Sequence, residues 1–423
     1  MVKKIQKHIF SLLGISLALL VALPGAAQLC TEIISPRFKT LKVSVANNFM
    51  MPPVIRLGTQ DRLIISFDEI AEQNSWLQYR VVHCDRDWCP SNIVESEYLD
   101  GFNIADIEDF EYSSNTYVHF VNYRIELPNN NMAPVVSGNY VVQVFDRDAP
   151  DETILQARFQ ITEGSAAVLG NVSTRTDRGV NDTWQQLDLA VMTDGLNVGN
   201  PYQDVFVTVE QNNRLDTRRM LRTPLRVEGN RLVYAHAPEL IFGAGNEYRR
   251  FETISVINSG MRVDSMRYGG TNYHAWIHPD APRNESTYSF DRTQHGRFLV
   301  REYNATDSDL GADYVTVHFT LDAAEMPDAD IYVDGEFSHG LYADFNRMTY
   351  DRELRAYTAE IPLKQGSYNY QYVVVPKGGG KGSPSKIEGD KYETENEYGV
   401  SVYFRPVGAR FDRLVGYGLL QSR

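Results

Sequence analysis

The chain has 423 residues, of which 43% are hydrophobic, 11% aromatic and 23% charged, and its formal net charge is −14. This composition is typical of a globular protein, and the length predicts about two to four domains of roughly 100 to 200 residues each. The acidic balance argues against a nucleic-acid partner and against binding to an anionic membrane surface, because both favour basic patches.

The first 27 residues predict a secretory signal peptide. A basic stretch, MVKKIQKH, precedes the apolar run IFSLLGISLALLVAL, and small residues precede the expected cleavage after Ala27. No later run reaches the ~18 apolar residues of a membrane helix, so we expect no membrane span in the mature chain. Cys30 follows Gln28 and Leu29, where a lipoprotein signal requires small residues, so no lipid anchor is expected.

From about residue 40 onward the dominant hydrophobic period is two. In RLIISFDEI, Leu63, Ile65 and Phe67 share one face, and GNYVVQVFDRD alternates in the same way. Clusters of Gly, Pro, Asn and Asp separate such runs at roughly the 8 to 12 residue spacing of antiparallel sandwiches. We therefore predict an all-β protein, with consecutive antiparallel β-sandwich domains of immunoglobulin-like type following the cleaved signal peptide.

The strand patterns fall into three predicted domains. The first covers 28–163 and ends with TILQARFQITEG, the second covers 164–305, and the third covers 306–405 and opens with YVTVHFTL. A polar link, NATDSDLGAD, separates the second domain from the third. Residues 406–423 are expected to form a C-terminal tail.

The stretch HCDRDWC gathers side chains that bind metals, form disulfides or act in catalysis. The preceding pattern WLQYRVVHC places Tyr79, Val81 and His83 on one face of a strand, and DRDWCPSN then predicts a turn. A zinc site would need a second pair of ligands at defined spacing, and the sequence supplies none. In an oxidising compartment Cys84 and Cys89 form a candidate disulfide, although their Cα geometry could forbid it. A cysteine nucleophile is the weakest of the three interpretations.

Other candidate sites give no positive evidence for chemistry. The acidic stretches DRDAPDE and DSDLGAD lack the Gly and Glu that complete a calcium loop, so solvated turns are expected there. His119 falls between Tyr117 and Val121 at an apolar-face position, which predicts a core histidine. The sequence holds no serine-hydrolase elbow, metalloprotease motif or dinucleotide fingerprint. We expect no catalytic residue, no metal, no cofactor and no small-molecule substrate.

Several long stretches resemble one protein family. The chain is similar to the plug protein of the type IX secretion system of Bacteroidetes over RLIISFDEI, YRVVHCDRDWCPSNIVESEYLDGFNIADIEDFEYSSNTYVHFVNYRIELPNNNM, SGNYVVQVFDRD, FGAGNEYRRFE and EGDKYETENEYGVSVYFRPVGARFDRLVGY. The resemblance covers nearly the whole mature chain. It implies a non-enzymatic periplasmic protein at the inner face of the outer membrane. There it would associate with the large β-barrel translocon and close its channel while no cargo passes.

The predicted third domain has a second resemblance. IYVDGEFSHG and MTYDRELRAYTAEIPLKQGSYNYQYVV are similar to early-set immunoglobulin-like domains, including glycogen-binding modules. Those modules stack sugars on tryptophan. This domain has no tryptophan, so Tyr342 or Phe345 would have to substitute. A carbohydrate-binding periplasmic or surface module is therefore the alternative function.

The C-terminal ending is a candidate contact with a partner. It concentrates Arg405, Arg410, Phe411, Arg413 and Tyr417, and Arg and aromatic residues are favoured at interface hot spots. The alternative is that the ending folds back as a final strand and packs on its own domain. The sequence leaves both possibilities open.

Overall fold

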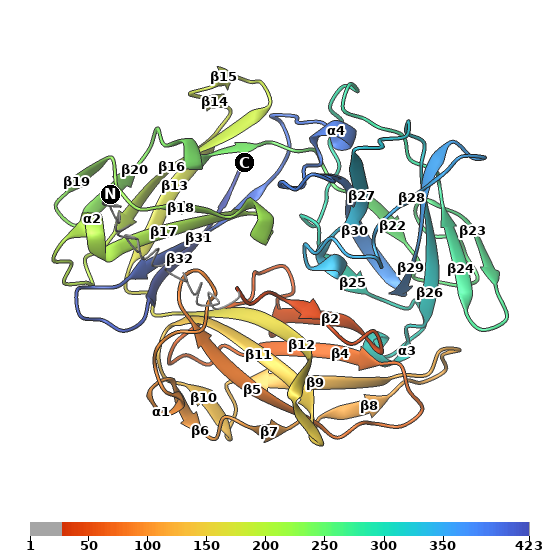
Figure 1. Ribbon diagram of the computed structural model, residues 1–423, viewed down its shortest axis with the longest axis horizontal. Coiled ribbons are helices and arrows are strands. Elements are labelled where there is room, and N and C mark those ends of the chain that lie inside the picture. Colours follow the sequence, from red (N-terminus) through yellow and green to blue (C-terminus); the bar gives the residue numbers. More distant parts are fainter. Residues whose placement is uncertain (1–27, 423) are drawn as a thin grey trace, which may run out of the picture.

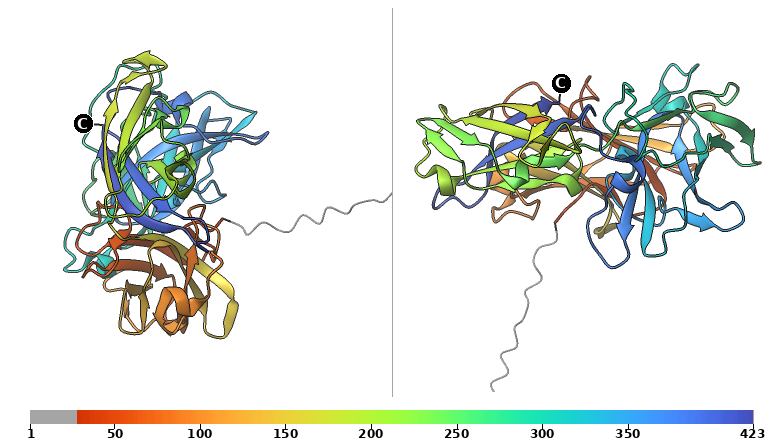
Figure 2. Two further views of the ribbon diagram at one scale, coloured as in Figure 1. Left: turned by 90° about the vertical axis from the view of Figure 1, so that its left-hand side faces the viewer. Right: turned by 90° about the horizontal axis from the view of Figure 1, so that it is seen from above.

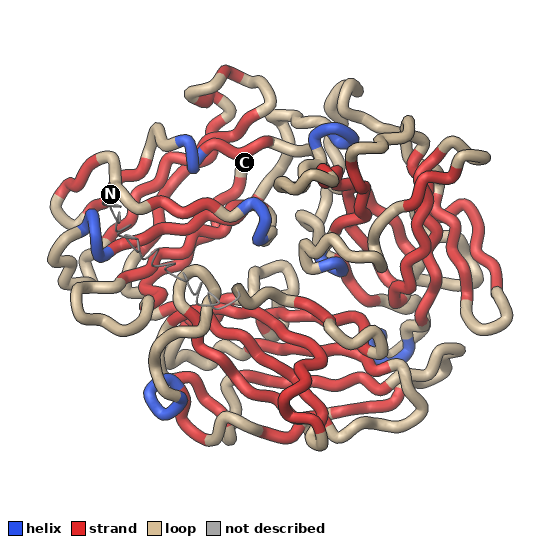
Figure 3. The backbone as a smooth tube through the Cα atoms, in the orientation of Figure 1, coloured by secondary structure: helices blue, strands red, loops and turns tan. Residues whose placement is uncertain are grey.

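A computed structural model describes residues 28–422, so the predicted signal peptide of residues 1–27 lies outside the described residues. The regular structure in the described part is mostly β-strand with a few one-turn helices (Figure 3). Nearly all strand pairs are antiparallel, and the sheets form three two-sheet units (Figure 1). The predicted all-β fold of antiparallel sandwiches is confirmed. No helix within residues 28–422 is long and apolar enough to cross a membrane.

The first unit packs a six-stranded sheet against a four-stranded sheet. The larger sheet has the order β1-β12-β11-β5-β7, with β3 added beside β12: β1 (Glu32–Ile33), β3 (Val54–Arg56), β5 (Leu77–Cys84), β7 (Ala105–Asp106), β11 (Gly138–Asp146) and β12 (Ala149–Thr162). The smaller sheet has the order β2-β4-β9-β8: β2 (Phe38–Val45), β4 (Leu63–Glu69), β8 (Phe110–Tyr112) and β9 (Val121–Leu127). The helix α1 (Glu95–Tyr98) and the pair formed by β6 (Leu99–Gly101) and β10 (Met132–Pro134) lie at one end.

The alternation of hydrophobic residues along the strands correctly predicts which side chains form the core of this unit. Leu63, Ile65 and Phe67 are completely buried between the two sheets. From the facing sheet, Tyr140 stacks on Phe159 with 5.4 Å between ring centroids. Burial of such large apolar side chains stabilises each unit by roughly 1.5 to 3 kcal/mol per residue.

His119 departs from its predicted position. The strand β9 begins only at Val121, so His119 lies in the preceding loop and is exposed. Its Nδ1 atom is 2.7 Å from a carboxylate oxygen of Glu72, which is also exposed. The prediction of a core histidine is wrong, because it extended the alternation of the strand into residues that precede the strand.

The second unit packs a five-stranded sheet against a four-stranded sheet. The first has the order β13-β16-β20-β19, with β21 beside β16: β13 (Ala167–Ser173), β16 (Trp184–Met192), β19 (Arg226–Glu228), β20 (Arg231–Tyr234) and β21 (Ile241–Gly243). The other has the order β18-β17-β31-β32: β17 (Val205–Gln211), β18 (Arg219–Leu221), β31 (Glu397–Phe404) and β32 (Arg413–Gln421). Smaller elements are the hairpin β14 (Arg175–Thr176) and β15 (Gly179–Val180), the helix α2 (Pro201–Asp204), and 3-10 turns at Leu215–Thr217 and Pro238–Leu240.

The third unit is again a two-sheet sandwich. One sheet has the order β22-β30-β25, with β27 also beside β30: β22 (Arg249–Glu252), β25 (Phe298–Val300), β27 (Ala329–Asp334) and β30 (Gly366–Pro376). The other has the order β23-β24-β26-β29-β28: β23 (Val263–Tyr268), β24 (Tyr273–Ile277), β26 (Tyr314–Leu321), β28 (Thr349–Asp351) and β29 (Ala356–Lys364). Short helices are α3 (Ser308–Gly311), α4 (Ser385–Glu388) and a 3-10 turn at Glu336–Ser338.

The third unit is inserted into the second. The strands β31 and β32 pair next to β17, and Val400, Val402 and Val415 join the core of the second unit. In contrast, β22 and β25 pair with β30 of the third unit although both precede residue 305. Strand pairing therefore crosses the predicted boundaries at 305 and 405, and the predicted tail contains a sheet strand. The alternation of hydrophobic residues identifies a strand, but it does not indicate which distant strand will pair with it.

The three units surround a common centre. In Figure 1 the first unit lies at the bottom, the second at the upper left and the third at the right. That view looks down the shortest axis, and the view from above in Figure 2 shows the resulting flattened shape. The chain runs from the first unit into the second, and it enters and leaves the third from the second. The contact between the first and third units is therefore entirely non-covalent.

The insertion makes a prediction about the C-terminal hairpin. Val415 is completely buried in the core of the second unit, whereas Val407 in the same hairpin is 93% exposed. We expect Val415→Asp to lower the free energy of unfolding by at least about 4 kcal/mol, because it buries an unpaired carboxylate, and Val407→Asp to change it by less than about 0.5 kcal/mol. Urea denaturation followed by fluorescence measures both. Equal effects would show that the hairpin is a dispensable tail.

Candidate functional site: the junctions between the three units

The HCDRDWC stretch lies at the junction of the first and second units. After β5 ends at Cys84, the chain forms a tight loop in which the N–H of Asp85 donates to Cys89 O and the N–H of Trp88 donates to Asp85 O, both at 2.9 Å. Trp88 has a left-handed backbone, with φ of 65°, and its side chain is 2% exposed. The guanidinium carbon of Arg158 lies 3.7 Å from the centre of the indole. The loop is therefore a packed structural element.

His83 is buried beside this loop. Its Nδ1 atom is 2.7 Å from Ser91 Oγ and its Nε2 atom is 3.3 Å from the carbonyl oxygen of Ser137, so both nitrogens have partners. Its ring packs edge-on against Tyr140 and Phe411, at 4.9 and 5.2 Å between centroids. Burial lowers the pKa of His83 to about 4, which keeps the imidazole neutral near pH 7. This histidine packs the junction rather than binding a metal.

The C-terminal segment binds directly to the HCDRDWC loop. Asp412 is completely buried and accepts hydrogen bonds from the backbone N–H of Arg86 at 2.9 Å and from its guanidinium at 2.6 Å. Asp85 accepts hydrogen bonds from Arg405 at 3.1 Å and from the backbone N–H of Asp412 at 3.0 Å. These four residues join the end of β5 in the first unit to the β31–β32 hairpin of the second.

The other residues predicted to contact a partner are also engaged within the chain. Arg410 forms an ion pair with Glu97 of α1. Arg413 donates two hydrogen bonds to Glu163, at 2.7 and 2.8 Å. Four of the five predicted residues thus meet the first unit or the segment that follows it, and Tyr417 alone faces a central cavity. Their role as contacts to another protein stays a prediction.

The disulfide between Cys84 and Cys89 also stays a prediction. Cys84 is buried with Trp88 and Val141 in a small apolar cluster, and its Sγ atom lies 3.9 Å from the carbonyl oxygen of Val82. Burial raises the pKa of the Cys84 thiol to about 12, so this cysteine is not an activated nucleophile. The backbone hydrogen bonds of the loop hold the two cysteines in the same turn.

A buried lysine–aspartate pair joins the first and third units. The Nζ atom of Lys364, at the end of β29, lies 2.6 Å from Asp68 Oδ2 in β4, and both side chains are at most 1% exposed. The hydroxyl of Tyr314 donates to the same oxygen at 2.6 Å, and the Phe120 ring centre is 3.9 Å from the ammonium. Burial lowers the pKa of Lys364, while the Asp68 carboxylate opposes that shift.

The acidic stretch DSDLGAD supplies further contacts at this junction. Asp309 forms an ion pair with Lys42 of β2. Asp313 is 5% exposed and accepts hydrogen bonds from the backbone N–H groups of Tyr117 and Val118, at 2.7 and 3.0 Å. The expectation of a solvated turn is wrong here, because the carboxylates bind donors of the first unit.

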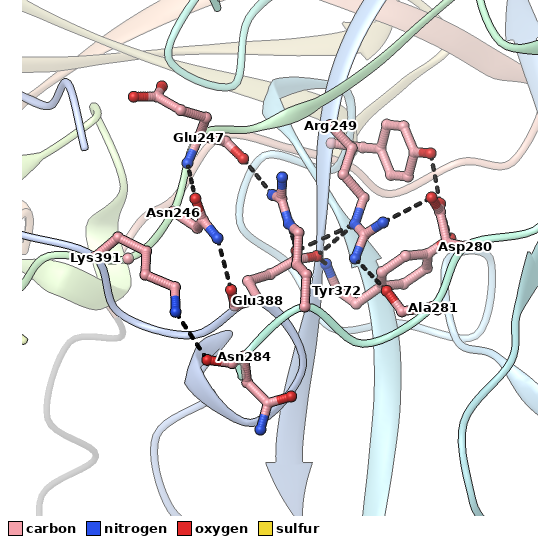
Figure 4. Close-up of polar contacts among 12 residues, drawn as sticks. Asn246, Glu247, Arg249, Asp280, Ala281, Asn284, Tyr372, Glu388 and Lys391 are labelled. Atoms are coloured by element: carbon pink, nitrogen blue, oxygen red, sulfur yellow. Dashed lines mark hydrogen bonds and ion pairs between the residues drawn. The ribbon is translucent and has the colours of Figure 1, made fainter. Parts of the chain in front are cut away.

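A buried ionic network lies in the third unit, beside the two chain connections to the second unit (Figure 4). Glu388 of α4 is 1% exposed and binds Arg249 at 3.0 Å and Arg283 at 2.6 Å. Asp280 is 2% exposed and binds Arg249 at 2.7 Å and Arg262 at 2.6 Å. Each carboxylate thus has two cationic partners, which is what buried charges require.

The same network ties together the two chain connections between these units. Glu247 lies in the entering connection and accepts a hydrogen bond at 2.9 Å from the backbone N–H of Glu395 in the returning connection. Beside it, the Asn246 side chain donates to the carbonyl oxygen of Glu388 at 2.8 Å (Figure 4). Burial raises the pKa of Glu247. These contacts therefore hold together the two chain connections through which the third unit is inserted into the second.

A cavity of ≈ 880 Å³ lies where the three units meet, and all three contribute to its lining. No group of three or more His, Cys, Asp or Glu side chains within residues 28–422 is placed to hold a metal ion. Tyr342, one of the two aromatic residues considered for sugar stacking, packs on Tyr332 and lies 3.2 Å from Asp216 of the second unit, whereas Phe345 is 46% exposed. Sequence reasoning missed the junction residues because no local pattern distinguishes an interdomain charge from a solvated one.

The geometry defines a class of protein: a flat assembly of three β-sandwich units, in which charged side chains join units instead of forming a reactive centre. The family model of the type 9 secretion system plug protein first domain matches residues 38–163. The crystal structure of a hypothetical protein from Parabacteroides merdae is 37% identical and has a TM-score of 0.92, covering 93% of this chain and 100% of that chain. The chain belongs to the type 9 secretion system plug protein family.

Other comparisons add nothing to this assignment. No curated protein matches the chain. The Pseudomonas fluorescens alkylpurine DNA glycosylase AlkC bound to DNA is 15% identical over 30% of each chain, with a TM-score of 0.17. The partial N-terminal region of an enterococcal surface protein is 8% identical, covering 94% of this chain and 96% of that chain, with a TM-score of 0.18. Similarity at these TM-scores supports no argument about fold or function.

The lysine–aspartate pair generates a stability prediction. Replacing Lys364 by Met leaves the Asp68 carboxylate buried without its cation, and we expect the free energy of unfolding to fall by about 3 to 5 kcal/mol. The matched control is Lys377→Met, because Lys377 is exposed and 4.0 Å from Asp330, and its effect should stay below about 1 kcal/mol. Chemical denaturation measures both variants. A small effect of Lys364→Met would mean that the pair does not hold the junction.

His83 generates a prediction about pH. Its pKa is about 4 in the folded protein and near 6.5 in the unfolded chain, so between these values only the unfolded chain binds the proton. Stability is therefore unaffected above pH 6.5 and falls by up to about 3 kcal/mol as the pH is lowered toward 4. We expect His83→Gln to flatten the dependence of the unfolding free energy on pH between 6.5 and 4.5. An unchanged slope in His83→Gln would contradict the assignment.

Proposed function

We propose that this protein is a non-enzymatic plug that closes the periplasmic end of the type IX outer-membrane translocon barrel while no cargo is in transit. The observation that carries the proposal is membership of the plug family, given by the first-domain match and by the full-length similarity to the Parabacteroides protein. The partner is then the large β-barrel of the system. The protein acts from the periplasm, at the inner face of the outer membrane.

The architecture suits a stopper that must be wide and stiff. Each unit has its own apolar core. Each pair of units is joined by a buried ion pair: Asp412 with Arg86, Lys364 with Asp68, and Glu397 of β31 with Arg297 beside β25. Displacing one unit of a closed triangle breaks two junctions at once. Resistance to deformation requires no reactive groups.

Co-purification tests this proposal. A tagged copy expressed at native level is recovered from outer membranes in mild detergent, and the associated proteins are identified and quantified by mass spectrometry. We expect near-stoichiometric recovery of one very large β-barrel protein. A tagged periplasmic protein of similar size and charge is the control for non-specific capture.

A permeability assay gives an independent readout. Cells without the plug should admit a large hydrophilic antibiotic or dye through the unsealed barrel, and the wild-type gene should restore exclusion. Recovery of the protein alone, together with unchanged permeability of the deletion strain, would contradict the plug function.

A further inference from the structure

We propose that the cavity at the centre of the triangle binds an extended polypeptide segment that carries basic side chains. This inference goes beyond closure of the barrel and does not rest on it, because it concerns the isolated protein in solution.

The cavity has the size and the walls of a binding site. Its volume of ≈ 880 Å³ falls within the range of about 300 to 1,000 Å³ that is usual for ligand sites. The first unit contributes the outer face of the sheet β2-β4-β9-β8, on which Ser44, Ile64 and Glu126 lie side by side in register. The second unit contributes one face of β31 and β32, and the third contributes β25. A bound segment would contact all three units.

Two walls of the cavity contain free sheet edges. The strand β2 ends its sheet and pairs only with β4. The strand β25 ends its sheet and pairs with no strand other than β30, while Glu336 accepts a hydrogen bond from Phe298 N–H and donates one to Gly296 O beside it. Residues 41–49 and 295–300 line the cavity without a gap. Since successive side chains of a strand point to opposite faces, an unbroken run means that the strand turns its edge toward the cavity. Free edges present N–H and C=O groups that pair with an added strand, so the geometry favours an extended peptide over a compact ligand.

The charges of the lining favour a basic occupant. Every lysine and arginine side chain of the lining already lies within 4.0 Å of a carboxylate: Lys42, Arg62, Arg124, Arg158, Arg214 and Arg297. Three lining carboxylates, Glu111, Asp307 and Glu336, form no ion pair within 4.0 Å among residues 28–422, although Arg297 and Lys42 act on Glu336 from a longer distance. Glu336 lies at the edge of β25, where its Oε2 atom accepts a hydrogen bond from Phe298 N–H at 3.4 Å that a paired peptide would replace. A cationic side chain of a peptide paired with β25 would meet this carboxylate.

Fluorescence anisotropy with two labelled peptides tests the proposal. The probe is the fluorescein-labelled heptapeptide KVKVKVK, which is basic and prone to extended structure, and the charge-reversed control is EVEVEVE. We expect saturable binding of the basic peptide at low ionic strength and none of the acidic peptide. Ser44→Trp, which places a large ring on the cavity floor, should weaken binding by at least about tenfold. The matched control is Ser265→Trp, at a half-buried strand serine of β23 outside the cavity, and it should bind like the wild type.

A second variant keeps the test decisive if Ser44→Trp fails to fold. Glu336→Gln removes one unpaired carboxylate without changing shape and should weaken binding by about threefold, whereas Glu360→Gln, on the exposed face of β29, should not. Absence of saturable binding, equal binding of both peptides, or binding unaffected by Ser44→Trp and Glu336→Gln would each overturn the proposal. None of these outcomes bears on whether the protein associates with the barrel.

Discussion

A buried carboxylate has to find cations or hydrogen-bond donors, and in this protein it often finds them on a neighbouring unit. Asp68 is held by Lys364 and Tyr314 across the first–third junction, and Asp412 by Arg86 across the first–second junction. Exchange of such pairs for apolar residues is often neutral for stability, but loss of one partner is strongly unfavourable. Such pairs therefore specify which surfaces meet more than they raise overall stability. Any misplaced docking of two units would leave several charges buried and unpaired.

The inserted topology makes this constraint act on the whole molecule. The second unit is complete only when β31 and β32 from the end of the chain join β17, and the third unit then lies between two connections fixed by Glu247 and Glu388. The first unit is covalently attached only to the second. Its ionic contacts with the third unit close the triangle and enclose the central cavity. A flat, closed body with separate cores is suited to blocking an opening, in agreement with membership of the plug family.

The HCDRDWC stretch shows how reactive residue types can serve architecture. His83 is neutral, buried and bonded at both nitrogens, Cys84 is buried with a raised thiol pKa, and Trp88 is covered by Arg158. Asp85 and Arg86 provide the charges that bind the C-terminal hairpin. The density of functional side chains in this turn reflects a junction between two units, where polar groups must be satisfied on both sides.

The sequence by itself determined the all-β class, the strand alternation that buries Leu63, Ile65 and Phe67, and the family resemblance. These features are local or collinear, because the period of two follows from the pleat of a strand and needs no knowledge of its partner. Only the tertiary structure decided that β31 and β32 complete the second unit, that Asp313 and Asp68 are buried junction residues, and that His119 lies outside its strand. The pairing of a strand and the burial of a side chain depend on residues up to several hundred positions away in the chain. Asp412, for example, is bound by Arg86. An aspartate that will be solvated and one that will meet a distant arginine are identical in the sequence.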